Sequence, residues 1–158
     1  MKRLVTTVAV VVGVCAGVAA QVLAQPNPNQ LINNRKGAMA LQGKYFGPIL
    51  AMAQGRAPYD AKLVQRNAEY LAVLTQMPWE DFQPHSLGLQ NTRAKEEIAK
   101  DQSKFKSTAE QLQAEVQKLQ AAARKGDENA VKAAAPAVAK VCNTCHEDFS
   151  TMNFRFKL

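Results

Sequence analysis

Two cysteines and a histidine near the end of the sequence have a spacing that can do chemistry. Cys142, Cys145 and His146 form a C-x-x-C-H motif, which is typical of a c-type haem attachment site. Two thiols can add to the two vinyl groups of a porphyrin, and a neutral imidazole can bind its iron. On a helix these three positions share one face. We therefore expect one covalent haem c per chain, with His146 bound to the iron.

Other uses of the two cysteines are less consistent with the sequence. A four-thiolate zinc site needs a second pair of cysteines, and the only further cysteine is Cys15. A thioredoxin-like redox pair belongs in a βαβ context, which the sequence pattern does not show. A structural cysteine pair without a cofactor is the remaining alternative.

Residues 1–24 have the composition of a secretory signal peptide. Two basic residues at the start precede a long uncharged apolar run, and Val22 and Ala24 fit the rule for signal cleavage. We expect the mature chain to begin at Gln25, to lack Cys15 and to be periplasmic. Cleavage after Ala20 and an uncleaved membrane anchor are the alternatives, because the apolar run is nearly long enough to span a bilayer.

The composition of residues 25–158 indicates one all-helical domain. Alanine, glutamine, leucine, lysine and glutamate dominate this part of the sequence. The formal net charge of the whole chain is +7, and two of the basic residues lie in the predicted leader. The remaining excess is spread along the chain, so it can attract an acidic protein partner but does not indicate nucleic-acid binding.

Apolar spacing predicts four helices, at residues 28–54, 61–76, 95–125 and 128–152, with a long loop at 78–93. The third helix carries a seam with a period of 3.5 residues, formed by Ile98, Phe105, Leu112 and Leu119 together with Gln102, Ala109, Val116 and Ala123. Asp60 and Asp127 are expected helix N-caps. We expect an antiparallel up-down-up-down four-helix bundle with one covalently attached haem. The loop carries Trp79 and Phe82, which we expect to fold back onto the core or the haem.

Four motifs give the sequence a resemblance to the cytochrome c′ family. They are R-x-x-x-M at 35–39, A-P-Y-D at 57–60, P-W-x-x-F at 78–82 and V-C-x-x-C-H at 141–146. The last motif is shared by many cytochromes, and its place at the end of a four-helix chain is the specific part. The resemblance implies an exported protein with one covalent haem between its helices, and homodimers through the first two helices in many members.

The resemblance also assigns roles to single residues. Cys142 and Cys145 match the thioether cysteines, and His146 matches the proximal iron ligand. Arg35 matches an arginine near a haem propionate, and Met39 matches the position that faces the other axial side of the iron. Ser150 departs from the family, because many relatives have a basic residue at that place. Proximal chemistry that depends on this charge is therefore in doubt.

The role of Met39 decides between two functions. If its thioether binds the iron, the protein carries single electrons through a six-coordinate haem, which is the function that we expect. The alternative is a five-coordinate haem that binds nitric oxide or carbon monoxide, and Gln42 can donate a hydrogen bond to such a ligand. Other candidate ligands are less well placed in sequence; they are Met52, Met77, Met152 and His85. No acid–base pair accompanies Met39 in sequence, so we expect no enzymatic activity.

Overall fold

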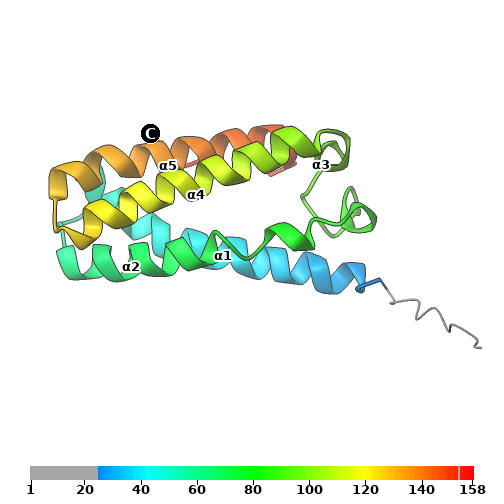
Figure 1. Ribbon diagram of the computed structural model, residues 1–158, viewed down its shortest axis with the longest axis horizontal. Helices are drawn as coiled ribbons and strands as arrows, with labels where there is room; N and C mark the ends of the chain where they lie inside the picture. The colour runs from blue at the N-terminus through cyan, green and yellow to red at the C-terminus, as the bar shows by residue number, and fades with distance from the viewer. Residues whose placement is uncertain (1–24, 153) are drawn as a thin grey trace, which may run out of the picture.

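Four long helices form the frame of the protein. The computed structural model describes residues 25–152 and 154–158. The long helices are α1 (Pro28–Ala53), α2 (Ala61–Leu74), α4 (Gln102–Arg124) and α5 (Glu128–Phe149). Successive long helices run in opposite directions and lie side by side (Figure 1). The predicted antiparallel up-down-up-down bundle is confirmed. The leader predicted at residues 1–24 lies outside the described residues.

Side chains at the helix starts set where α2 and α5 begin. The Asp60 carboxylate accepts a hydrogen bond from the Leu63 amide at 3.0 Å, and the Asp127 carboxylate accepts one from the Ala130 amide at 2.9 Å. Both residues are therefore the N-caps that the sequence predicted. Such caps satisfy backbone amides that have no partner in the first helical turn. Gly126 adopts a φ of +67° between α4 and α5, a conformation that glycine tolerates best.

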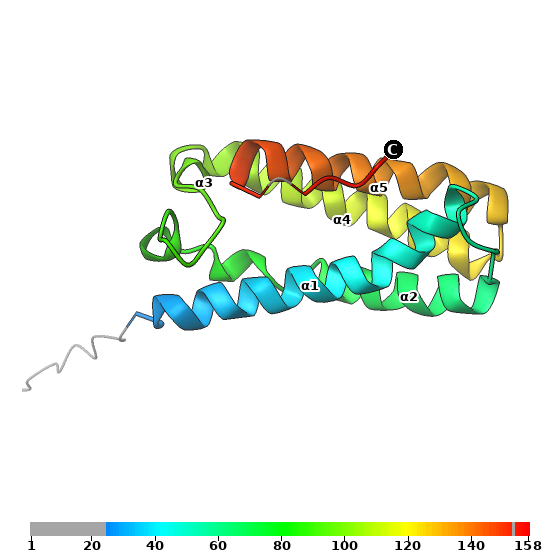
Figure 2. The same cartoon turned by 180° about the vertical axis from the view of Figure 1, so that it is seen from behind.

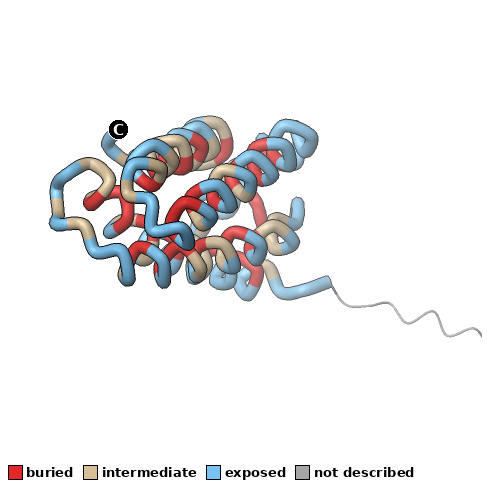
Figure 3. The backbone as a smooth tube through the Cα atoms, turned by 60° about the vertical axis from the view of Figure 1, so that its left-hand side comes forward, coloured by how far each residue is buried: buried red, intermediate tan, exposed pale blue. Residues whose placement is uncertain are grey.

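The interior of the bundle is packed with aliphatic side chains from all four long helices. Val64, Val116, Leu119 and Val131 are each 0% exposed, and Figure 3 shows the buried positions on the sides of the helices that face one another. The predicted seam of the third helix is buried along its length except at Gln102, which is exposed. The prediction for Gln102 is wrong because this residue is the first of α4 and lies beside a break in the helix.

The predicted third helix is two helices. A short α3 (Glu97–Lys100) ends at Asp101, whose φ of −128° and ψ of 64° are not helical. The Asp101 carboxylate accepts a hydrogen bond from the Lys104 amide at 3.0 Å and so caps α4. An aspartate competes with the helical backbone in this way, which explains the break. The long loop before α3 contains two 3₁₀ turns, Trp79–Asp81 and Pro84–Ser86.

The last helix is shorter than predicted. It ends at Phe149 instead of residue 152, because Ser150 has an extended backbone and forms an isolated bridge with Ala94. The Thr151 amide also donates to the Arg93 carbonyl at 2.9 Å. These contacts tie the end of α5 to the long loop. Among the described residues, no helix has both the length and the apolar character needed to cross a membrane.

Candidate haem site

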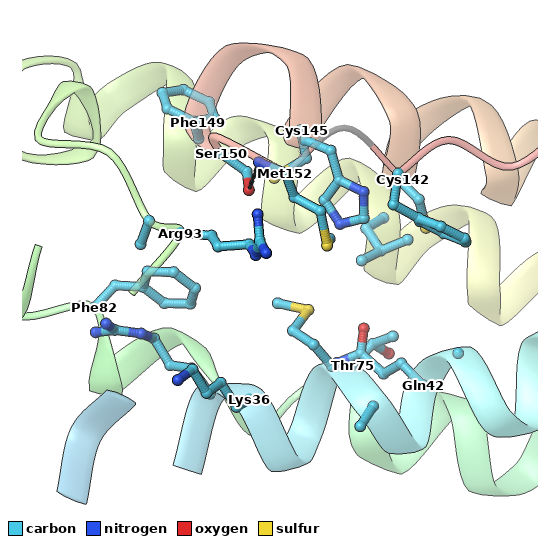
Figure 4. A pocket seen from close by; sticks show the side chains of 18 of the residues that line it. Lys36, Gln42, Thr75, Phe82, Arg93, Cys142, Cys145, Phe149, Ser150 and Met152 are labelled. Atoms are coloured by element: carbon cyan, nitrogen blue, oxygen red, sulfur yellow. Dashed lines mark hydrogen bonds between the residues drawn. The ribbon is translucent and has the colours of Figure 1, made fainter. Parts of the chain in front are cut away.

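A mostly apolar pocket lies between α1, α5, the long loop and the segment after α5. Its cavity measures about 480 Å³, which falls within the range of roughly 300–1,000 Å³ for cofactor pockets. Figure 4 shows side chains entering it from α1, from the loop and from α5. Several aromatic rings line it: Phe46, Trp79, Phe82, Phe105, Phe149, Phe154 and Phe156. The prediction that Trp79 and Phe82 fold back onto the site region is confirmed.

Cys142, Cys145 and His146 all line this pocket from α5, as their helical spacing predicts. Both thiols are free. Burial raises the pKa of the Cys142 thiol to about 12, and burial together with Asp148 raises the pKa of the Cys145 thiol to about 11. Both sulfurs are therefore protonated thiols at neutral pH. A four-thiolate zinc site would need two further cysteines, and the part of the chain that the structure describes holds only this pair, whereas two reduced thiols can add to the two vinyl groups of a porphyrin.

The imidazole of His146 has the properties of a metal ligand. Burial lowers its pKa, and the positive charge of Arg155 lowers the pKa further, while the nearby Phe154 backbone acts in the opposite direction. A neutral imidazole is the form that binds iron. Its Nδ1 atom is buried and has no hydrogen-bond partner among the described residues. A buried ring nitrogen without a partner costs free energy, so we expect a bound metal ion or cofactor to interact with the His146 ring.

The α1 side of the pocket contains the other predicted axial residue. Met39 is half-buried and lines the pocket, next to the small residues Ala40 and Gly43. The side-chain amide of Gln42 donates to the Leu74 carbonyl at 3.1 Å. One N–H of this amide is therefore used by the fold, and the other remains for a ligand in the pocket.

Of the other candidate ligands, the structure places one at the pocket and three away from it. Met152 lines the pocket, and Figure 4 shows its thioether pointing into the cavity. Three others do not line it: Met52 packs in the core, Met77 is exposed, and the ring of His85 lies 3.0 Å from the Pro26 carbonyl. The sequence does not favour Met152 as a ligand, because it follows His146 closely along the chain. The early end of α5 turns it back toward the pocket.

Arg35 lies at the edge of the pocket, but the fold already uses most of its donors. Its side chain is buried, and Nη1 donates to the Asp81 carbonyl and to Ser86 Oγ at 2.6 Å. Nη2 donates to the Ser86 carbonyl at 2.8 Å and to Thr92 Oγ1 at 3.2 Å. The guanidinium also stacks over the Phe82 ring at 4.8 Å. Arg35 therefore anchors the long loop to α1, and its role toward a propionate stays a prediction.

Two further cations line the pocket and were missed in the sequence. Arg93 and Lys36 have exposed side chains that border the cavity, and Figure 4 shows the Arg93 guanidinium extending into it. Among the residues that the structure describes, those that line the pocket include no aspartate or glutamate. Arg93 ends an Asn-Thr-Arg run in the same loop as Trp79 and Phe82, and its position in that loop is the signal that could have identified it.

Comparisons with known proteins agree with this architecture. Residues 30–150 match the family model described as Cytochrome C'. A cytochrome c' from Rubrivivax gelatinosus is 36% identical over 122 residues, which cover 77% of this chain and 95% of the relative. The crystal structure of cytochrome c' from that organism has a TM-score of 0.75 and covers 79% of this chain and 98% of its own. A mutant of cytochrome c prime from Alcaligenes xylosoxidans, solved as a nitric oxide complex, is 32% identical with a TM-score of 0.74, covering 81% of this chain and 98% of its own.

Replacing Cys142 and Cys145 together with alanine tests covalent attachment. We expect acidified organic solvent to extract the haem from this double variant and to leave it on the wild-type chain, because only thioether bonds resist such extraction. A Thr144→Ala variant is the control, since this exposed residue lies between the cysteines and contributes no sulfur. Complete extraction of haem from the wild-type protein would contradict the assignment.

Proposed function

The chain belongs to the cytochrome c′ family, and we propose that it is a periplasmic protein whose single covalent haem binds nitric oxide or carbon monoxide on the Met39 side of the iron. This is the alternative that the sequence left open beside electron transfer. The observation that carries it is the pocket: its attachment residues lie on α5, and the opposite α1 side presents the small residues Ala40 and Gly43 beside Met39. A family member solved as a nitric oxide complex supports the same ligand class.

The residues that would hold the haem follow from the site. Cys142 and Cys145 would form the thioether bonds, and His146 would bind the iron. The bound haem supplies an iron that takes up a diatomic ligand. Apolar side chains around the cavity exclude water, and the free N–H of Gln42 can donate to a ligand on the α1 side. This environment favours a small, weakly polar ligand over a charged one.

The haem propionates need cationic partners near the mouth of the pocket. We assign Arg93 to one propionate, with Lys36 beside it, because both line the cavity and their charged ends are not buried. Arg35 supports the contact between Arg93 and the propionate indirectly, because it donates a hydrogen bond to Thr92, the neighbour of Arg93 in the loop. A forked guanidinium is well matched to a carboxylate.

Electron transfer through a six-coordinate haem is the second candidate. It is favoured by the position of Met39, which lines the pocket from α1, the helix across the pocket from the His146 helix. A thioether there would stabilise the reduced iron and block the site against other ligands. Neither candidate requires a catalytic group, and we propose no enzymatic activity.

Export and dimerisation are part of the proposal. Removal of residues 1–24 is supported by their sequence pattern, and intact-mass measurement of the exported protein tests it.

A homodimer through α1 and α2 is supported by the exposed apolar side chains of Leu41, Tyr70 and Val73. Light scattering in solution tests the homodimer. A measured mass equal to that of one chain would contradict it.

Substitution of Met39 tests which function is correct. If the site is open, ferrous wild-type protein binds carbon monoxide at a rate proportional to its concentration. Met39→Ala then raises the association rate about tenfold, equivalent to about 1.4 kcal/mol of barrier, because a crowding side chain is removed. Met39→Leu, which keeps the bulk but not the sulfur, should resemble the wild type. Stopped-flow or flash-photolysis measurements check this.

The contrary result is a wild-type rate that levels off as carbon monoxide is increased. Such saturation means that a protein ligand must leave first. If Met39→Leu abolishes the saturation, Met39 is the ligand and the electron carrier is the correct function.

Substitution of Arg93 tests the propionate assignment. Arg93→Gln removes the charge but keeps a hydrogen-bond donor, so we expect the pKa of the contacting propionate to rise by about one unit, at the lower end of the effect of a nearby arginine on a carboxylate. The pH dependence of the midpoint potential of the haem reports this pKa. Arg66→Gln is the control, because Arg66 is an exposed α2 residue outside the pocket lining. An unchanged profile in Arg93→Gln would refute the assignment.

A further inference from the structure

The segment after α5 folds back across the pocket. Figure 2 shows it running back along α5 on the side that faces α1. Met152, Phe154 and Phe156 line the cavity, although Phe154 is also partly open to solvent, whereas Arg155 and Lys157 are exposed and do not line it. The apolar side chains of Met152, Phe154 and Phe156 therefore lie toward the pocket. We call residues 154–158 the strap.

Asn143, the residue between the two cysteines that follows Cys142, holds the strap on α5. Its Oδ1 accepts a hydrogen bond from the Phe156 amide at 2.8 Å, and its Nδ2 donates to the Phe156 carbonyl at 2.9 Å. Both backbone groups of one strap residue are thus paired with one side chain. Gln54, the C-cap residue of α1, donates through Nε2 to the Lys157 carbonyl at 2.7 Å. The strap is therefore attached to both helices that border the pocket.

A row of aromatic rings joins the strap to the core and to His146. The rings of Phe46 and Phe156 lie 5.0 Å apart, and those of Phe156 and Phe154 also lie 5.0 Å apart. The Phe154 ring lies 6.3 Å from the His146 ring. All three pairs meet edge to face, an arrangement that stabilises aromatic contacts beyond the area they bury. Phe154 therefore lies against the imidazole and occupies space into which that ring would otherwise move.

We propose that the strap closes the His146 side of the pocket to small ligands, and that Asn143 is the positioning residue that holds it there. The proposal rests on the proposed function, because it requires a bound haem with His146 on its iron. Phe154 restrains the imidazole, and Phe156 fills the space between α5 and α1. Ligands then reach the iron only from the Met39 side, and His146 stays bound when a strong ligand such as nitric oxide binds opposite to it.

Hydrogen exchange of the ferric, haem-loaded protein tests whether Asn143 holds the strap. We expect Asn143→Ala to speed amide exchange in residues 154–158 about tenfold, because two hydrogen bonds to the backbone are lost. Thr144→Ala is the matched control: it lies next in the same motif, is exposed, and donates only to the Lys140 carbonyl of its own helix. Equal strap exchange in the wild type and Asn143→Ala would overturn the positioning role. This readout does not depend on ligand binding.

Electron paramagnetic resonance of the nitric oxide complex tests whether the strap keeps His146 on the iron. Wild-type protein and Thr144→Ala should retain the histidine, whereas Asn143→Ala and Phe154→Ala should lose it in a several-fold larger fraction of molecules. Phe154 is 48% exposed, so its truncation leaves the bundle core intact. Loss of the histidine in the wild type, or equal fractions in all variants, would overturn the proposal. A wild-type protein that binds no nitric oxide would instead refute the proposed function, while the exchange experiment would still report on the strap.

Discussion

The spacing of three side chains on one helix face constrains how the rest of the site is built. A single haem can be reached by Cys142, Cys145 and His146 only from one face of α5, so α5 supplies one side of the pocket. Every other side must come from elsewhere in the chain. The bundle provides α1 across from α5, the long loop closes one end, and the segment after α5 folds back over the remaining opening.

Arg35 fixes the long loop to α1 through four hydrogen bonds. A buried guanidinium is costly unless its donors are paired, and Arg35 meets this need with two backbone carbonyls and two hydroxyl groups of the loop. Hydrogen bonds to a charged group contribute roughly 1.5–3 kcal/mol each. Burial lowers the pKa of this guanidinium, and the carboxylate of Asp81 opposes that effect. The same contacts bring Phe82 over the pocket and place Arg93 at its edge, so one charged side chain organises an otherwise irregular segment.

Periodic apolar patterns predicted the bundle well because regular helices repeat their burial every three or four residues. The order of the long helices, the caps Asp60 and Asp127, and the meeting of Cys142, Cys145 and His146 in one pocket all followed from such local rules. The break at Asp101 did not, because a side chain that caps an internal turn competes with a helix that the pattern alone favours.

Apart from Lys36, which lies on α1, the parts of the site that the sequence did not predict lie in irregular segments. Arg93 and the strap reach the pocket through contacts between distant parts of the chain, and no repeat in the sequence records such contacts. The Arg35 interaction illustrates the same limit: the residue was identified, but its loop partners at 81–92 were not. The sequence contains Met152, Phe154 and Phe156 at alternate positions, but this spacing predicts a segment that lines the pocket only if α5 ends at Phe149.

Under the proposed function, His146 alone binds the iron and the Met39 side is open. Low-temperature electron paramagnetic resonance of the ferric wild-type protein, recorded without added ligand, tests this claim most directly. An open site predicts an axial high-spin signal from five-coordinate iron. A rhombic low-spin signal would show a second strong protein ligand, would contradict the account, and would make the protein a six-coordinate electron carrier.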